Sequence, residues 1–249
     1  MLREIRAALP AESLYYVADS ANAPWGDKTP EFVRSRGVAI GRYLAAKGVK
    51  AIVIGSNTGT AGSAEGLRAA VTVPVIAMEP GIKPAAAATR TGVVGAIVTA
   101  TMSDSDRMAS LIERFGTGLK VISVPVPGLV EHVETADLDS PELRRLVEGY
   151  IRPLLDAGAD TIVLGSTHYV FLRTVITSIA GSSVTLIDTG AAVARQLARI
   201  LQELGLEARQ GSVPAERFWT SGDTQESTRV MSALLGRSVS VERLPASVA

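Results

Sequence analysis

Cysteine is absent from the 249-residue sequence, and His132 and His168 are its only histidines. The absence of cysteine excludes disulfides, thiolate metal sites and cysteine nucleophiles. With two histidines, a zinc site would need an unusually carboxylate-rich set of ligands. No cluster of such residues stands out in the sequence, so we expect no metal.

Net charge and long apolar runs are lacking as well. Lys+Arg and Asp+Glu both number 25, so the formal net charge is +0, which argues against nucleic-acid or membrane-surface binding driven by bulk charge. No run is long enough to span a membrane, and the start, MLREIRAALP, lacks the apolar core of a signal peptide. Neither common glycine-rich phosphate-binding motif occurs. We expect a soluble cytoplasmic protein without nucleic-acid or membrane partners.

Short aliphatic runs do occur, and they alternate with segments of helix length. Several are apolar at successive positions, as strands buried on both faces are. This alternation predicts an α/β protein with largely parallel sheets. The candidate strands are Leu14–Ala18, Ala51–Ile54, Val73–Ala77, Gly92–Val98, Lys120–Val124, Thr161–Leu164, Val184–Ile187 and Arg217–Thr220.

The segment from Ser140 to Gly158 carries the clearest helix signals. Ser140 can cap the helix, Pro141 suits its first turn and Gly158 can end it. Between them runs one apolar stripe. A second helix is predicted from Thr29-Pro30-Glu31 toward Gly48.

One local pattern occurs twice. The segment 50–58, KAIVIGSNT, is echoed by 160–168, DTIVLGSTH. Both are predicted strand-to-turn units, and ligands of α/β folds gather at the carboxyl ends of parallel strands. The alternative is that the polar residues only cap the helices that follow.

Further motifs run through almost the whole chain, and in their order they resemble those of glutamate racemases, in the cofactor-independent aspartate/glutamate racemase superfamily. They are YVADS at 16–20, PWGDK at 24–28, SNT at 56–58, PVI at 74–76, EPGIKP at 79–84, GSTHY at 165–169, LIDT at 186–189 and RFWTSGD at 217–223.

The resemblance implies two pseudo-symmetric parallel-sheet α/β domains that face a central cleft. The first would comprise residues 1–83 and 190–249, and the second residues 84–189. It also implies a homodimer, no organic cofactor, and interconversion of L- and D-glutamate for bacterial peptidoglycan. In the family, two thiols on opposite faces of the α-carbon exchange its proton.

The same resemblance assigns the site residues. Ser56 and Ser166 occupy the positions of the thiols, and His168 and Glu134 match the residues that assist them. The residues expected to hold the carboxylates and amine of the substrate are Pro24, Trp25, Gly26, Asn57, Thr58, Thr101 and Thr167.

The chain departs from the family pattern at several of these places. Both thiols are replaced by hydroxyls, Trp25 replaces a tyrosine, and a family threonine falls on Met102, with Thr101 beside it. The family's first strand, which ends in Asp-Ser-Gly and supplies an assisting aspartate, has no counterpart in this sequence.

Serine is a much weaker acid than cysteine. A thiol has a pKa of ~8.5, whereas a hydroxyl lies nearer water's ~15.7. The gap costs roughly 7–10 kcal/mol for forming the anion, out of the ~8–23 kcal/mol by which enzymes lower barriers. The sequence therefore predicts severely impaired racemisation.

Three other interpretations stay open. The chain could be a non-catalytic binding protein for glutamate or a related acid, held through Asn57, Thr58 and Thr167. It could make a regulatory protein contact, since some glutamate racemases restrain DNA gyrase. It could also be a damaged remnant with an exposed sheet edge and poor stability.

Overall fold

The structure is a computed structural model that describes residues 1–103, 105–209 and 211–248. It divides into two compact units: unit 1 is Met1–Met78 with Gly190–Ala249, and unit 2 is Glu79–Thr189. Every strand pairing within the described residues is parallel. The predicted α/β class with parallel sheets is confirmed.

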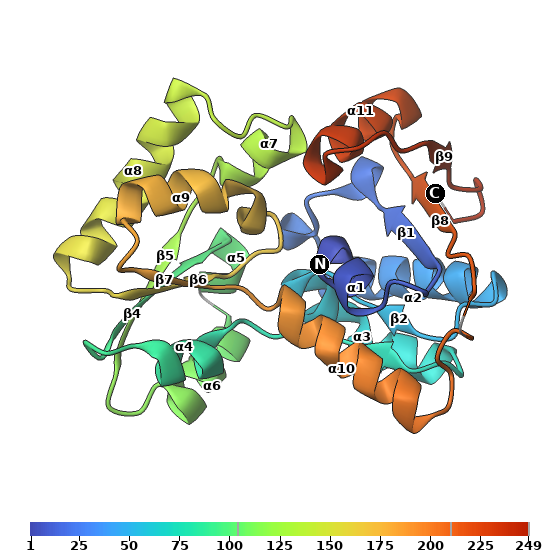
Figure 1. Ribbon diagram of the computed structural model, residues 1–249, viewed down its shortest axis with the longest axis horizontal. Coiled ribbons are helices and arrows are strands. Elements are labelled where there is room, and N and C mark those ends of the chain that lie inside the picture. The colour runs from blue at the N-terminus through green and yellow to red at the C-terminus, as the bar shows by residue number, and fades with distance from the viewer. Residues whose placement is uncertain (104, 210, 249) are drawn as a thin grey trace. The chain divides into compact units, whose positions relative to one another are not determined.

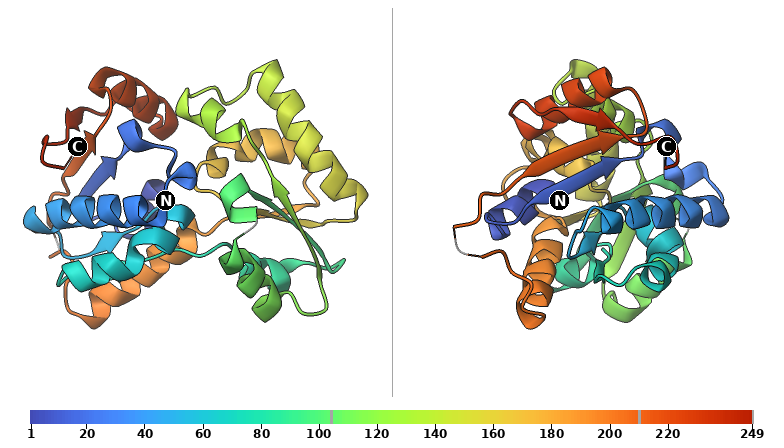
Figure 2. Two further views of the ribbon diagram at one scale, coloured as in Figure 1. Left: turned by 180° about the vertical axis from the view of Figure 1, so that it is seen from behind. Right: turned by 90° about the vertical axis from the view of Figure 1, so that its right-hand side faces the viewer.

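Unit 2 is built around a sheet with the strand order β5-β4-β6-β7. Its strands are β4 (Val93–Val98), β5 (Lys120–Pro125), β6 (Thr161–Leu164) and β7 (Thr185–Ile187). Helices α4 and α6 lie on one face of this sheet and α8 and α9 on the other (Figures 1 and 2). The helices of unit 2 are α4 (Ile82–Ala88), α5 (Ala100–Ser103), α6 (Asp106–Phe115), α7 (Leu129–Glu134), α8 (Pro141–Asp156), η3 (Tyr169–Leu172) and α9 (Arg173–Ala180).

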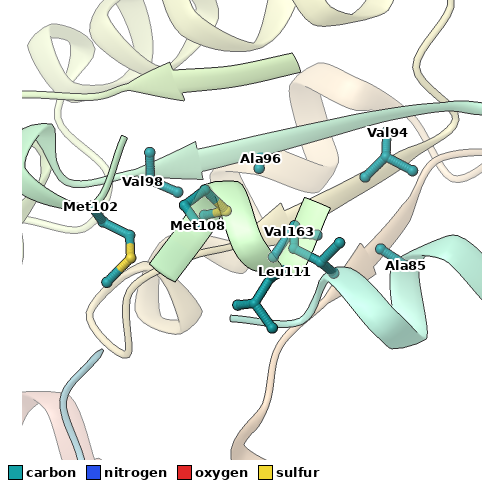
Figure 3. Packing of buried hydrophobic residues seen from close by; sticks show 9 residues of the cluster. Ala85, Val94, Ala96, Val98, Met102, Met108, Leu111 and Val163 are labelled. Atoms are coloured by element: carbon teal, nitrogen blue, oxygen red, sulfur yellow. The ribbon is translucent and has the colours of Figure 1, made fainter. Parts of the chain in front are cut away.

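Two central strands carry the core of unit 2. All residues of β6 are buried, and β4 is buried from Val94 to Val98. On one face, apolar side chains of α4, α5 and α6 pack against them (Figure 3). Burying one Val, Leu or Ile side chain contributes about 1.5–3 kcal/mol. This packing holds the end of β6 in place, and with it the residues that follow, Gly165 and Ser166.

The helix predicted from Ser140 is α8, which confirms the capping signals. The Ser140 hydroxyl accepts a hydrogen bond from the Leu143 N–H at 3.1 Å, and Pro141 is the first helical residue. Gly158 follows the helix with a φ of 89°, a left-handed conformation that glycine adopts without strain. Four side chains of its apolar stripe are buried, namely Leu143, Val147, Ile151 and Leu154, and the other two, Leu146 and Leu155, are half-buried.

Unit 1 holds two sheets within the described residues, β1-β8-β9 and β2-β3. The strands are β1 (Leu14–Ala18), β2 (Ile52–Val53), β3 (Val75–Ile76), β8 (Glu216–Thr220) and β9 (Val241–Arg243). Strand β9 is too short and too polar to have been predicted from its sequence. The helices are α1 (Leu2–Ala8), η1 (Ser20–Asn22), η2 (Trp25–Asp27), α2 (Pro30–Ala46), α3 (Asn57–Ala70), α10 (Gly190–Glu203) and α11 (Thr224–Leu235).

Helices α2 and α3 approach each other closely at glycines. A Cβ added at Gly37 would lie 2.3 Å from the Ser63 side chain, and one at Gly41 would lie 2.2 Å from Leu67. Both distances are far below van der Waals contact, so only glycine permits this approach. The contact fixes α3, whose first turn follows directly on Ser56.

Candidate functional site

The two echoed segments end in Gly-Ser turns, one in each unit. Gly55-Ser56 comes shortly after β2 and leads into α3. Gly165-Ser166 comes directly after β6 and leads toward η3. Each serine thus lies beyond the carboxyl end of a parallel strand, as predicted, where α/β folds place their ligands.

In unit 2, Ser166 begins a chain of three polar side chains. Its Oγ lies 3.3 Å from Nδ1 of His168. The Nε2 atom of the same ring lies 2.7 Å from Oε1 of Glu134, at the end of α7. The hydroxyl also accepts a hydrogen bond from the His168 backbone N–H at 3.3 Å. The structure therefore brings together three residues that the sequence placed in one site.

The order of these contacts assigns the protons. An ionised carboxylate only accepts hydrogen bonds, so Nε2 of His168 donates to Glu134. In the neutral ring Nδ1 is then the acceptor, and the Ser166 hydroxyl donates to it. Hence Glu134 orients the imidazole so that its basic nitrogen meets the serine.

The charge of Glu134 is stabilised by this contact. The hydrogen bond from His168 and the charge the ring can carry hold the pKa of Glu134 below its usual value, although burial opposes the shift. Half of the Glu134 side chain is exposed, with 55% of its surface accessible, so the contact is a modest contribution to stability. Its importance lies in fixing the tautomer of His168.

In unit 1, the Ser56 hydroxyl has a different partner. It accepts a hydrogen bond from the Gly59 N–H at 3.1 Å and so caps the N-terminus of α3. Within the described residues, no imidazole or carboxylate lies within hydrogen-bond distance of this Oγ. The capping role that the sequence left open is thus present at Ser56.

The predicted substrate-binding residues next to the two serines directly follow them in both turns. Asn57 and Thr58 form the first turn of α3, with Asn57 buried and Thr58 half-buried. Thr167 is half-buried between Ser166 and His168. Thr101 lies in α5, and its side chain is outside the part of the structure that is described. The neighbouring Met102 is buried in the core of unit 2.

The Pro24-Trp25-Gly26 segment is tied to Asp19 by its tryptophan. The Trp25 Nε1–H donates to Oδ2 of Asp19 at 3.0 Å, and Arg36 forms an ion pair with the same carboxylate at 2.5 Å. Burial alone would raise the pKa of Asp19, but hydrogen bonds from Arg36 and Asn22 outweigh it and hold the pKa below its usual value. Asp19 therefore fixes the loop that carries Trp25.

Sequence reasoning missed the part that Arg36 plays. Its Nη1 also donates to the backbone carbonyl of Val248, 212 positions further along the chain. Arg36 is one of three arginines in α2, and the local sequence gave no sign of either contact. The nearest signal was the pair of buried glycines, Gly37 and Gly41, which marks the face of α2 that packs inward.

His132, the other histidine, is half-buried and has a carboxylate partner. Its Nδ1 lies 2.8 Å from Oδ2 of Asp137, and 18% of its side chain is exposed. The same carboxylate oxygen accepts a hydrogen bond from the Ser140 hydroxyl at 2.6 Å. Both contacts explain why α7 and the cap of α8 are joined.

No group of three or more His, Cys, Asp or Glu side chains that could hold a metal ion occurs among the described residues. In the same part of the chain, no helix is long and apolar enough to cross a membrane.

Comparisons with known proteins agree with the motifs. The family model for Asp/Glu/hydantoin racemase matches residues 1–197. The chain belongs to this family. A glutamate racemase from Ectopseudomonas mendocina is 49% identical over 242 residues, which cover 97% of this chain and 92% of that protein.

Solved structures of racemases also share the fold. A glutamate racemase from Bacillus anthracis superposes with a TM-score of 0.87 at 30% identity, covering 100% of this chain and 93% of that one. The Escherichia coli glutamate racemase, solved with L-glutamate and the activator UDP-MurNAc-Ala, gives a TM-score of 0.86 at 27% identity, covering 98% and 92%. The resemblance seen in the motifs therefore extends over the whole fold.

Proposed function

We propose that this chain interconverts L- and D-glutamate by two-base proton transfer, at a rate severely reduced by its two serines. The observation that carries the proposal is the chain of contacts from Ser166 through His168 to Glu134. It supplies a base at the position where the family places a proton-transfer group.

Ser166 and Ser56 would act on opposite faces of the α-carbon. His168 would take the proton of Ser166 as that hydroxyl removes the α-proton, and Glu134 would stabilise the imidazolium that forms. The carboxylates and amine of glutamate would be held by residues whose donors need no ionisation. These are Pro24, Trp25, Gly26, Asn57, Thr58, Thr101 and Thr167.

The reduced rate follows from the chemistry of the hydroxyl. Forming an alkoxide costs roughly 7–10 kcal/mol more than forming a thiolate. A positioned general base typically recovers about 10²- to 10⁴-fold in rate, which is only part of that difference. His168 offers such help to Ser166, whereas Ser56 is engaged as a helix cap.

The family membership also supports expectations about location, oligomeric state, cofactors and biological role. We expect a cytoplasmic homodimer without metal or organic cofactor, which supplies D-glutamate for peptidoglycan.

The decisive experiment is proton NMR of the purified protein with L-glutamate, and separately with D-glutamate, in heavy water. We expect slow loss of the α-proton signal over hours, above a heat-inactivated control. A folded sample that shows no exchange from either enantiomer would overturn the proposal.

A second candidate is a non-catalytic binding protein for glutamate or a related small acid. It is favoured by the capping hydrogen bond at Ser56, which uses that hydroxyl structurally. It predicts saturable broadening of the glutamate signals in the same spectra without any α-proton exchange.

A further inference from the structure

Unit 2 contains two clusters that each combine a serine, a histidine and an acid. In the first, Ser166 contacts His168, which contacts Glu134. In the second, Asp137 lies in the middle and accepts hydrogen bonds from both Ser140 and His132. Only the first has the histidine between the hydroxyl and the carboxylate.

That order decides which serine can become a nucleophile. A serine is activated when a neutral imidazole nitrogen accepts its proton and a carboxylate orients the ring from the other side. Ser166 meets both conditions, since Nδ1 of His168 faces its Oγ at 3.3 Å and Nε2 faces Glu134 at 2.7 Å. Ser140 donates to a carboxylate, which fixes the hydroxyl but takes no proton from it at neutral pH.

The position of Ser166 favours the same role. It lies directly beyond the carboxyl end of the fully buried β6. Gly165 precedes it, and a Cβ there would lie 2.7 Å from the Ile97 carbonyl oxygen, so the turn fits closely against β4. Ser166, Thr167 and His168 are themselves half-buried rather than enclosed. A rigid strand end thus presents a partly accessible hydroxyl together with its base.

We propose that Ser166 is an acyl- and phosphonyl-accepting nucleophile, activated by His168 and positioned by Glu134, so that the protein hydrolyses activated aryl esters. The proposal is independent of glutamate racemisation, because it needs only residues of unit 2. Aryl esters and fluorophosphonates suit this serine because their leaving groups depart without being protonated first.

The steps balance as follows. The Ser166 proton moves to Nδ1 of His168 while Oγ bonds to the carbonyl carbon of the ester. The bond to the aryl oxygen breaks and the phenolate departs as the anion, after which His168 releases that proton to the phenolate or to solvent. Water then attacks the acyl-serine, releasing the carboxylic acid and restoring Ser166. With a fluorophosphonate, Oγ bonds to phosphorus and fluoride departs, so the label stays on the protein.

The test is labelling of the full chain with a fluorophosphonate probe, followed by peptide mapping, with p-nitrophenyl acetate hydrolysis measured in parallel. We expect the label on Ser166 and not on Ser140. Ser166→Ala should abolish it, and His168→Gln should lower its rate about 100-fold or more. Ser182→Ala is the matched control, since it removes an exposed hydroxyl of the same unit that has no part in either cluster.

Glu134 is a positioning residue, and its test needs a readout that packing alone would not change. With two histidines in the chain, nitrogen-15 NMR can resolve each ring. We expect the Nε2–H tautomer at His168 and the Nδ1–H tautomer at His132. Glu134→Gln should mix the tautomers of His168, leave those of His132 unchanged, and lower labelling about tenfold.

Two results would overturn the proposal. One is a label spread over several serines. The other is labelling of Ser166 at an unchanged rate in His168→Gln, when thermal melting shows that the variant is folded. Neither readout involves glutamate, so failure here leaves the proposed racemisation standing, and absence of α-proton exchange leaves this proposal standing.

Discussion

The two Gly-Ser turns are alike in sequence and unlike in what surrounds the hydroxyl. Ser56 accepts a hydrogen bond from the Gly59 N–H and caps α3. Ser166 faces a histidine whose other nitrogen contacts Glu134. The same residue in the same local motif therefore has a structural partner in unit 1 and a chemical partner in unit 2.

The glycines that precede the two serines differ in how closely other residues pack against them. A Cβ at Gly165 would lie 2.6 Å from Val98 and 2.7 Å from the Ile97 carbonyl oxygen. A Cβ at Gly55 would come no closer than 4.0 Å to the nearest described atom outside its chain neighbours, the Met1 Cγ. Close packing against a neighbouring strand therefore holds the turn in unit 2 more firmly.

The starts of the two echoed segments differ as well. Lys50 donates to Oε1 of Glu12 at 2.9 Å. Asp160, at the corresponding place, accepts hydrogen bonds from the Thr89 hydroxyl at 2.7 Å and from the N–H groups of Arg90 and Thr91 at 2.7 and 3.1 Å. The echo thus preserves strand and turn, while the groups that hold each end are specific to each unit.

The largest predicted effect is on the rate of α-proton exchange, when cysteines replace the serines of both turns. Ser56→Cys combined with Ser166→Cys should raise the α-proton exchange rate of glutamate about 1,000-fold or more, because a thiol ionises some five to seven pKa units more readily than a hydroxyl. Proton NMR in heavy water measures it.

The two single cysteine variants are the controls for that experiment, and the double Ser→Ala variant gives the background rate. If the folded double cysteine variant exchanged no faster than the unmodified chain, ionisation of the hydroxyls could not be what limits the rate.

A smaller effect, on stability, is expected at the starts of the two segments. Burial raises the pKa of Asp160, but hydrogen bonds from Thr89, Arg90, Thr91 and Thr161 outweigh it and leave the pKa well below its usual value. Asp160→Asn should therefore lower the free energy of unfolding by about 1–3 kcal/mol at pH 7. Lys50→Ala should also lower it by about 1–3 kcal/mol, because the buried carboxylate of Glu12 would lose its ion-pair partner.

The pH dependence of this effect has a definite sign. Because the pKa of Asp160 is lower in the folded chain, its contribution is fully present above the ordinary aspartate value of ~3.9 and is lost as pH falls below it. Urea unfolding at pH 7 and at acid pH should show the gap between the unmodified chain and Asp160→Asn closing. A gap that widened with acid would contradict the assignment.

The smallest predicted effect is a difference in the free energy of unfolding between Ser56→Ala and Ser166→Ala. Ser56→Ala removes the cap of α3 and should cost about 1 kcal/mol. Ser166→Ala removes a half-buried hydroxyl that caps no helix, so we expect a change within about 0.5 kcal/mol. Thermal melting of both variants checks this, and an equal or reversed order would show that Ser56 does not serve mainly as a cap.

Much of the fold could be predicted from local patterns. Buried strands such as β6 are apolar at successive positions, here from Ile162 to Leu164, and α8 carries a serine cap, an early proline and a terminal glycine. Strand β9 was missed because its three residues, Val241–Arg243, show too little of either signal.

The site was predictable only in part. The family resemblance suggested which residues belong to it, including Glu134, which lies 34 positions before His168. What each hydroxyl contacts could not be predicted, because Ser56 and Ser166 share one local motif and their partners depend on packing. The contacts of Arg36 with Asp19 and Val248 were hidden for the same reason.

The most direct test of the whole account compares exchange from the two enantiomers of glutamate. In the proposed reaction, His168 would assist Ser166 in removing one α-proton, whereas Ser56 has no such base among the described residues. One enantiomer should therefore lose its α-proton in heavy water at least about tenfold faster than the other. Glu134→Gln should slow the faster reaction and leave the slower one unchanged. Equal rates for the two enantiomers, both unaffected by Glu134→Gln, would contradict the account.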